Sequence, residues 1–186
     1  MVRRIDGTGT RRLTRGDETA PVWSPRGDLI AFVRPHGRAR GCGLQQALYV
    51  VPAKGGRVRA LLKPEFLCGA VLDPDWAPSG TRLAVSLIQS LAEMGPDNRD
   101  TTTDALAKAQ RGINLVALDG SRRRVLPFGS DPTWSPDGHE IAYFAQTCDG
   151  APASTMSLCA TTPRGTPRRA IASLTTPPFG LTWFSR

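Results

Sequence analysis

The chain has 186 residues, of which 40% are hydrophobic, and 24 Lys and Arg against 16 Asp and Glu give a formal net charge of +8. That length suffices for one domain with a sizeable core, and the lack of any apolar run of 18 residues excludes a transmembrane helix. Residues 1–10 do not resemble a signal peptide, because Asp6 and Gly7 stand where an apolar region is required. Sixteen prolines and 19 glycines indicate a turn-rich all-β protein.

One phrase, Pro-x-Trp-Ser/Ala-Pro-x-Gly followed by an apolar run, recurs along the chain at residues 21–32, 74–85 and 132–143. A degraded fourth copy begins at Leu181. The spacings between successive tryptophans are 53, 58 and 49 residues, for Trp23, Trp76, Trp134 and Trp183. Self-similarity at a period of this length predicts a stack of repeated supersecondary units.

Each copy of the phrase predicts two strands joined by a tight turn. Proline fixes φ at the first central position of the turn, and glycine accepts the positive φ that follows. The predicted turn residues are Pro25, Gly27, Pro78, Gly80, Pro136, Asp137 and Gly138. Trp23, Trp76 and Trp134 end the first strand of each copy, and we expect all three to be buried as equivalent core residues between units.

A second hairpin follows the phrase in each unit. Apolar runs that begin at Leu48, Ile113 and Met156 are each followed by a glycine-containing turn and a second, arginine-rich run. Asp-Gly and Gly-Gly between apolar runs are strong hairpin signals. Each unit is therefore predicted as four antiparallel strands, which is the pattern of a β-propeller blade with the phrase at its innermost strand.

The phrase resembles the PD40 repeat of TolB-like, WD40-like propellers, whose hallmark is Pro-x-Trp-Ser-Pro-Asp-Gly followed by Ile-Ala-Phe. Residues 132–143 match almost letter for letter, whereas Arg26, Ala77 and Ser79 depart from the pattern. The resemblance covers nearly the whole chain. It implies the propeller fold, usually with six blades, but it implies little about function.

We expect residues 1–186 to form a single propeller domain with full blades at 15–62, 63–128 and 129–172. Residues 1–14 are predicted as the two outer strands of an earlier blade, and 173–186 as part of a later one. Two explanations remain open. The chain is either a fragment of a longer propeller or a small closed ring of four blades, and the fragment is favoured because open sheet edges recruit other chains.

The four cysteines are predicted to form two disulfides, since Cys42 and Cys68 fall in loops of one face, and Cys148 and Cys159 bracket one hairpin connection. Such pairs indicate an oxidising compartment, either periplasmic or extracellular. The alternative is four free thiols in a cytosolic protein. A zinc site is not expected, because the spacings are wide and no histidine neighbours a cysteine.

Arginines gather on or beside the predicted outermost strands and should form a basic rim around the propeller. They are Arg11, Arg12, Arg57, Arg59, Arg122, Arg123, Arg124, Arg168 and Arg169. One interpretation is attachment to an anionic partner. The favoured one is protection of exposed edge strands from aggregation. Nucleic acid is not an expected partner, because no aromatic residues interleave with the arginines.

The sequence contains no nucleophile elbow, P-loop, zinc-protease or dinucleotide-binding motif, so we expect no catalytic residue and no cofactor or metal. His36 is interpreted as a loop residue and His139 as an exposed strand residue. The acidic residues Asp97, Asp100 and Asp104 lack the spacing of a calcium loop. They lie in an insertion at residues 89–112, which is either a functional loop or a decorative one.

The favoured function is a non-enzymatic binding or scaffolding propeller that contacts a protein partner outside the cytoplasm. Two alternatives remain open. One is a fragment of the propeller that gates a serine hydrolase of the prolyl-oligopeptidase type, and the other is the sensor propeller of a membrane-anchored regulator. The remainder of the propeller, or self-association of the chain, is expected to cover open strand edges.

Overall fold

The computed structural model describes residues 1–4, 6–38, 44–63, 69–89, 110–148 and 156–174. Over these residues it contains strands and no helix. The strands are β1 (Thr19–Trp23), β2 (Leu29–Arg38), β3 (Leu44–Pro52), β4 (Arg59–Leu62), β5 (Gly69–Trp76), β6 (Arg82–Gln89), β7 (Gln110–Ala117), β8 (Arg122–Leu126), β9 (Ser130–Trp134), β10 (Ile141–Ala145), β11 (Met156–Thr161) and β12 (Arg168–Leu174).

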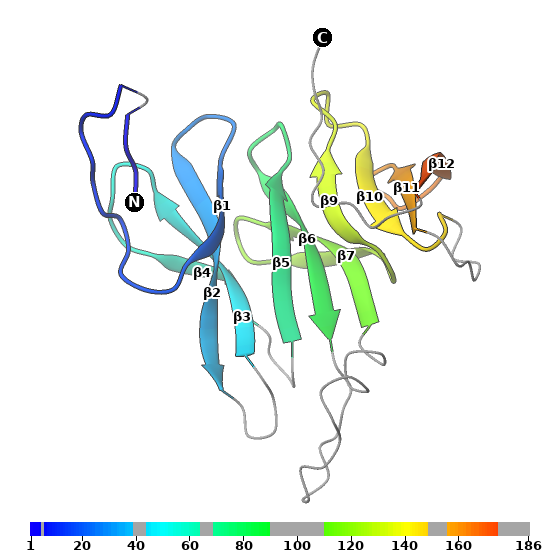
Figure 1. The fold of residues 1–186 in the computed structure, drawn as a ribbon, viewed down its shortest axis with the longest axis horizontal. Coiled ribbons are helices and arrows are strands. Elements are labelled where there is room, and N and C mark those ends of the chain that lie inside the picture. The colour runs from blue at the N-terminus through cyan, green and yellow to red at the C-terminus, as the bar shows by residue number, and fades with distance from the viewer. Residues whose placement is uncertain (5, 39–43, 64–68, 90–109, 149–155, 175–186) are drawn as a thin grey trace, which may run out of the picture.

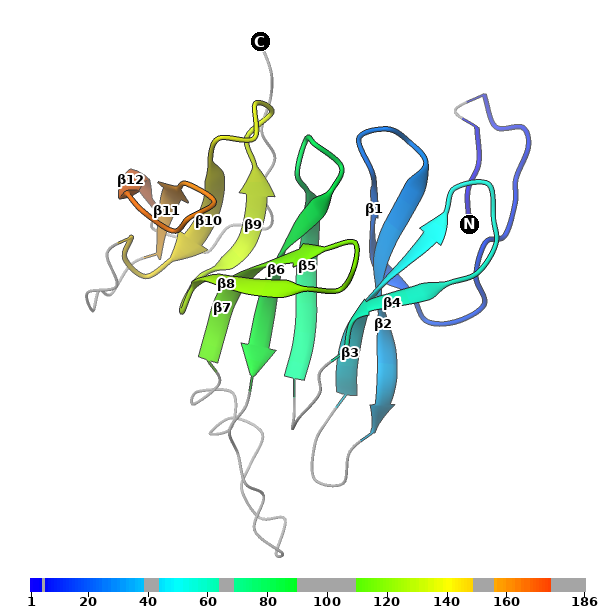
Figure 2. The ribbon, with the colours of Figure 1, turned by 180° about the vertical axis from the view of Figure 1, so that it is seen from behind.

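The strands form three antiparallel units of four, named here blade 1 (β1–β4), blade 2 (β5–β8) and blade 3 (β9–β12). A single parallel bridge between Gln46 and Ala70 joins the sheets of blades 1 and 2. The blades stand side by side in a row, with residues 1–14 at one end and β12 at the other (Figures 1 and 2). The prediction of an all-β fold built from four-stranded blades is confirmed.

The repeated phrase forms the same turn in every blade. Gly27, Gly80 and Gly138 have φ values of 68°, 68° and 73°, a region that a side chain at Cβ disfavours. The N–H of each glycine donates to the carbonyl three residues earlier, at 2.8, 2.8 and 2.9 Å. The turn that the sequence predicts is therefore formed three times with one geometry.

A second repeated feature precedes each tryptophan by three residues. Ala20, Asp73 and Asp131 have φ values of 48°, 50° and 50°, and the pairing register of the strand shifts beside each of them. Aspartate tolerates this left-handed region better than most residues, whereas alanine does not. The result is a bulge at the entrance to every blade, which the sequence interpretation did not include.

The hydrophobic core lies between the blades. Leu48 and Leu61 of blade 1 pack with Trp76, Leu83 and Val116 of blade 2 in one cluster. Blades 2 and 3 repeat this arrangement in a second cluster, whose members are Ala77, Ala84, Leu115, Trp134 and Ile141. Because successive side chains of a strand point to opposite faces, each inner strand contributes to two such layers. Each blade thus completes its core only against its neighbours.

Residues 1–14 cover part of the outer face of blade 1. Val2 and Leu13 pack against a cluster that contains Ile30 and Phe32. The only β-pairing in this segment, apart from Ile5, which lies outside the described residues, is one bridge in which Val2 and Arg11 exchange two N–H···O bonds of 2.8 Å. The prediction of two regular strands is therefore wrong, because the segment closes as a loose hairpin with a single bridge.

The prediction that all three tryptophans are buried fails for one of them. Trp76 and Trp134 are 5% and 6% exposed, and the indole N–H of Trp76 donates to the Val22 carbonyl of blade 1 at 3.2 Å. Trp23 is 52% exposed. Trp76 and Trp134 lie in clusters that the preceding blade helps to form, whereas no described blade packs against Trp23.

We expect the three tryptophans to differ in energy according to burial. Trp76→Ala and Trp134→Ala should each lower the free energy of unfolding by about 3–5 kcal/mol, since they empty a closed slot. Trp23→Ala should lower it by only about 1 kcal/mol, because half of the side chain already contacts water. Urea denaturation measures all three, and equal losses would contradict the assignment of Trp23 to an open face.

Candidate functional site

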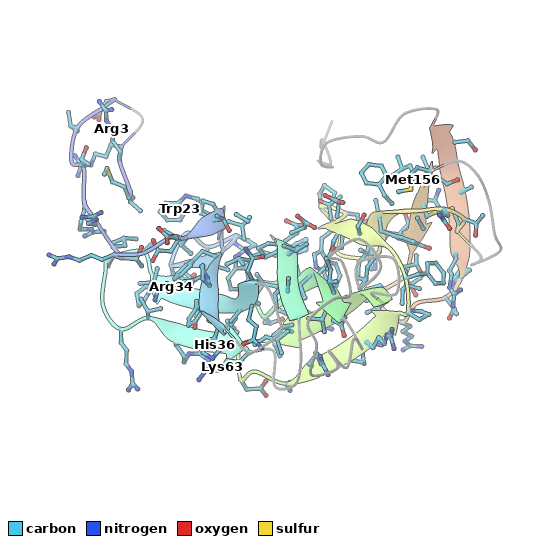
Figure 3. All side chains as sticks on the ribbon, turned by 60° about the horizontal axis from the view of Figure 1, so that its bottom comes forward. Arg3, Trp23, Arg34, His36, Lys63 and Met156 are labelled. Carbon is cyan, nitrogen blue, oxygen red and sulfur yellow. A yellow bond between two sulfur atoms is a disulfide. The ribbon has the colours of Figure 1, made fainter. Side chains whose placement is uncertain are left out.

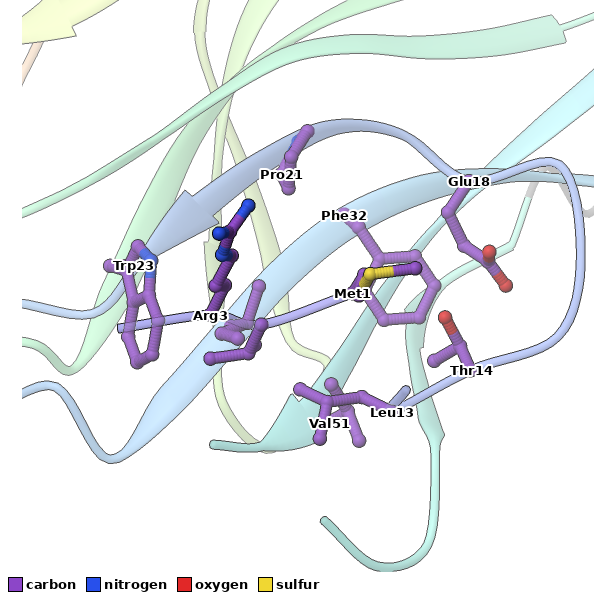
Figure 4. A pocket seen from close by; sticks show the side chains of 11 residues that line it. Met1, Arg3, Leu13, Thr14, Glu18, Pro21, Trp23, Phe32 and Val51 are labelled. Atoms are coloured by element: carbon purple, nitrogen blue, oxygen red, sulfur yellow. The ribbon is translucent and has the colours of Figure 1, made fainter. Parts of the chain in front are cut away.

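A concavity lies in front of blade 1. It is a cleft of about 340 Å³ between residues 1–14 and the face of β1 and β2. Trp23 and Phe32 supply aromatic walls, while Arg3, Glu18 and Thr14 supply polar groups (Figure 4). We call the exposed surface of Trp23 and Gly27, together with the adjoining side chains of Ile30, Phe32 and Val51 that lie buried beneath Val2 and Leu13, the open face of blade 1.

An ion pair fixes the rim of this cleft. Arg34 on β2 donates to the Oε1 atom of Glu18 from Nε at 3.1 Å and from Nη2 at 2.5 Å. Burial acts to raise the pKa of Glu18, but hydrogen bonds from Arg34 and Thr14, with the charge of Arg34, outweigh it and hold the pKa below its ordinary value. Glu18 is therefore an ionised, paired carboxylate at neutral pH.

The guanidinium of Arg34 also stacks on two aromatic rings. Its central carbon lies 5.3 Å from the Phe32 ring centroid and 5.2 Å from that of Tyr49. The Nδ1 atom of His36 lies 2.7 Å from the Tyr49 hydroxyl, and Figure 3 shows His36 farther along blade 1 than Trp23 and Arg34. The interpretation of His36 as a loop residue is wrong, because β2 extends through Arg38.

The other turn residues predicted from the sequence stabilise the turns and pack them against one another. The Oδ1 atom of Asp137 accepts from the Ser135 hydroxyl at 2.6 Å and from the N–H of His139 at 3.0 Å. These hydrogen bonds, that of Ser135 first, lower the pKa of Asp137. Pro25 and Pro78 pack against the next blade, because a Cβ placed on Gly80 or Gly138 would lie 3.8 or 3.6 Å from them. The turns of successive blades therefore contact each other.

Asp75 joins blades 2 and 3 and was missed in the sequence. Its Oδ2 atom accepts from the backbone N–H of Trp134 at 2.6 Å and from the Thr133 hydroxyl at 3.1 Å. Burial raises the pKa of Asp75 and prevails over the hydrogen bonds that lower it. The position before the tryptophan is variable in the repeat, as Val22 and Thr133 show, so the sequence carried no signal for this bridge.

Three arginines of the predicted rim, one in residues 1–14 and two in blades 1 and 2, each reach the blade that follows them in the chain. Arg11, Arg59 and Arg123 each donate to a backbone carbonyl of the following blade, with Ala53, Leu118 and Pro163 as the respective acceptors. The three acceptors occupy one position, because each is the residue after the carbonyl that closes the turn between the third and fourth strands. This linking role was missed, since the arginines were interpreted only as rim charges.

Cys148 and Cys159 form a disulfide, with their Cα atoms 5.4 Å apart. The pair was predicted from its position around a hairpin connection of blade 3. Cys42 and Cys68, the acidic residues Asp97, Asp100 and Asp104, and Trp183 lie outside the described residues. Within the described part, no three His, Cys, Asp or Glu side chains gather as a metal site would require, and no helix could span a membrane.

Comparison with known proteins supports the fold. A protein described as TolB from Agrobacterium tumefaciens is 19% identical, with a TM-score of 0.54, over 81% of this chain and 44% of that one. The β-propeller domain of the Trilobed protease from Pyrococcus furiosus is 13% identical, with a TM-score of 0.52, over 87% of this chain and 43% of that one. Acylaminoacyl peptidase from Pyrococcus horikoshii is 14% identical, with a TM-score of 0.62, over 93% of this chain and 28% of that one.

The fold is therefore a TolB-like β-propeller. This chain spans less than half the length of each of these three proteins. No family model matches it, and no curated protein matches it in sequence. At identities below 25% the likeness concerns the fold alone, and the three proteins include both a TolB and peptidases, so their activities do not decide that of this chain.

The raised pKa of Asp75 predicts how the stability of an Asp75 variant depends on pH. Because folding raises the pKa of Asp75 above 3.8, its contribution to stability is present below the unfolded pKa and is lost as pH rises through the folded pKa. Asp75→Asn keeps an acceptor oxygen but cannot ionise. The stability of this variant relative to the wild type should rise between about pH 3 and about pH 7.

Asp137→Asn is the matched control, because folding lowers the pKa of Asp137. Its contribution is present above the unfolded pKa and is lost as pH falls, so the relative stability of this variant should fall as pH rises. Denaturation midpoints at several pH values measure both trends. Two variants with the same trend would contradict the burial of the Asp75 charge.

Proposed function

We propose that this propeller is a non-enzymatic module that binds a protein partner in an oxidising, extracytoplasmic compartment. The observation that carries the proposal is the open face of blade 1. Trp23 is 52% exposed there, beside a cleft of about 340 Å³ with apolar walls and a polar rim. Exposed tryptophans beside apolar pockets are typical centres of protein–protein contacts.

The charges around the cleft favour binding over proton transfer. Glu18 is held ionised by Arg34, and a carboxylate with a lowered pKa is a poor proton donor at neutral pH. Arg34 is itself held by Glu18 and by two aromatic rings. This arrangement keeps the rim in one conformation, which lowers the entropy lost when a partner binds.

The disulfide supports the compartment. Cys148 and Cys159 close a connection with a sequence separation of 11 residues. Structural disulfides persist where the environment is oxidising, and cytosolic thiol systems keep most such pairs reduced. The TolB-like fold is compatible with this location, although likeness of fold is weaker support than the bond itself.

A photoreactive residue tests the binding role. With p-benzoyl-phenylalanine in place of Trp23, irradiation of cells that produce the protein should give a covalent adduct with a protein, identified by mass spectrometry. The same residue in place of Asp119, exposed on blade 2, is the control. If position 23 gives no adduct, or only the adducts of position 119, the open face is not a binding surface.

Thiol trapping tests the compartment. When cells are treated with an alkylating reagent before lysis, Cys148 and Cys159 should resist modification until a reductant is added. Replacing both by serine should lower the free energy of unfolding by about 3 kcal/mol, because the bridge no longer restricts the unfolded chain. Complete alkylation in intact cells without reductant would contradict an oxidising location.

A further inference from the structure

A short pattern, arginine followed two residues later by an aliphatic residue, marks the same position in four places. The register shows the equivalence within the blades, because Arg59, Arg123 and Arg169 pair with Val50, Leu115 and Ala160. Each of these partners lies two residues before the residue whose carbonyl closes the turn. The four pairs are Arg11 with Leu13, Arg59 with Leu61, Arg123 with Val125, and Arg169 with Ile171.

Three of these pairs dock on the following blade. Each of the three arginines donates to the turn carbonyl described above. Their aliphatic partners pack into the adjoining core clusters, Leu61 into the one that contains Trp76 and Val125 into the one that contains Trp134. Leu13 does the same against blade 1. An arginine and an aliphatic residue thus form the repeated outer contact between consecutive units.

The fourth pair lacks this contact. Arg169 bonds instead to Glu140 of its own blade, at 2.7 and 3.2 Å, and remains exposed. Ile171 is 43% exposed, whereas its equivalent Leu61 is 6% exposed. Blade 3 therefore presents the residues of a docking surface with no described blade against them.

The open face of blade 1 has the complementary features. A Cβ placed on Gly27 would meet nothing within 4 Å, whereas Gly80 and Gly138 face a proline of the preceding blade. Trp23 lacks the closed slot that holds Trp76 and Trp134. The two ends of the row therefore carry the two halves of the contact that joins the blades inside it.

We propose that blade 3 of one copy docks on the open face of blade 1 of a second copy, with Arg169 and Ile171 at the positions that Arg11 and Leu13 hold within the chain. The inference rests on the proposed function, because it names the partner of the open face. Pro136 then contacts Gly27, and blade 3 supplies the wall that Trp23 lacks. The contact is heterologous, joining two different surfaces.

This assignment gives residues 1–14 a defined role. Arg11 and Leu13 occupy the outer part of the open face, so an incoming copy displaces them. They act as an intramolecular competitor that weakens docking without preventing it. Both copies carry a formal charge of +8, so added salt should strengthen association by screening their repulsion.

A mixing experiment with two variants tests the geometry. Ile171→Asp disables the docking surface of blade 3, and Trp23→Asp disables the open face of blade 1. Both side chains are substantially exposed, so both variants should keep the wild-type circular dichroism spectrum. In sedimentation velocity the wild type should associate as concentration rises, and each variant alone should stay monomeric.

An equimolar mixture of the two variants should form dimers and nothing larger, because it retains one intact contact. Ser79→Asp adds the same charge on an exposed turn of blade 2 and should associate like the wild type. A monomeric mixture, a wild type that stays monomeric at high concentration and salt, or variants that still associate alone would overturn the proposal.

A third variant tests the competitor. Leu13→Asp should release residues 1–14 and tighten self-association by about tenfold, and Ile171→Asp should abolish that gain. Unchanged or weaker association of Leu13→Asp would overturn this role. If the mixture is monomeric while the photoreactive residue at position 23 captures a different protein, the second copy is excluded as partner and the proposed function stands.

Discussion

The structure depends on a packing constraint: a blade of this chain has two apolar faces and cannot bury both by itself. In β2, Ile30 and Phe32 belong to the cluster on which Val2 and Leu13 pack, whereas Ala31 between them belongs to the cluster shared with blade 2. In β6, Leu83 and Ala84 contribute to two different layers in the same way. The hydrophobic effect therefore acts between blades, and it holds each blade in place through its neighbours.

Directional contacts at the edges of these layers set the relative position of the blades. At the inner end, the Trp76 indole binds the Val22 carbonyl and the Asp75 carboxylate binds the N–H of Trp134. At the outer end, arginines reach the carbonyls of the next turn. Apolar layers alone would tolerate sliding, so these polar contacts at both ends fix the register between blades.

The fold could be predicted because its determinants are local. The Pro-x-Gly turn, the alternation of apolar residues and the second hairpin all lie within a few residues of one another, and the structure has them where the sequence indicates. The burial of Trp23 could not be predicted from its own repeat, since burial depends on what precedes the repeat in space. The positive φ at Ala20 could not be predicted either, because alanine is not a residue that favours the left-handed region.

The candidate site was less visible for a related reason. Asp75 and Trp134 are 59 residues apart, and their hydrogen bond exists only after two blades have packed. The sequence indicates that arginines gather on the outermost strands. Which of two adjacent arginines faces the next blade, however, depends on strand register. Sequence patterns report which residues are charged or apolar, whereas a binding face is defined by the direction in which those residues point.

The acceptors of the linking arginines have a consequence for how such a protein can change over generations. Ala53, Leu118 and Pro163 differ in the size and shape of their side chains, and each offers only its main-chain oxygen. Substitutions at the tip of one hairpin therefore leave its bond to the adjacent unit intact. Duplicated units of this kind can drift apart in sequence, or be lost and gained, while the rules for stacking one on another stay the same.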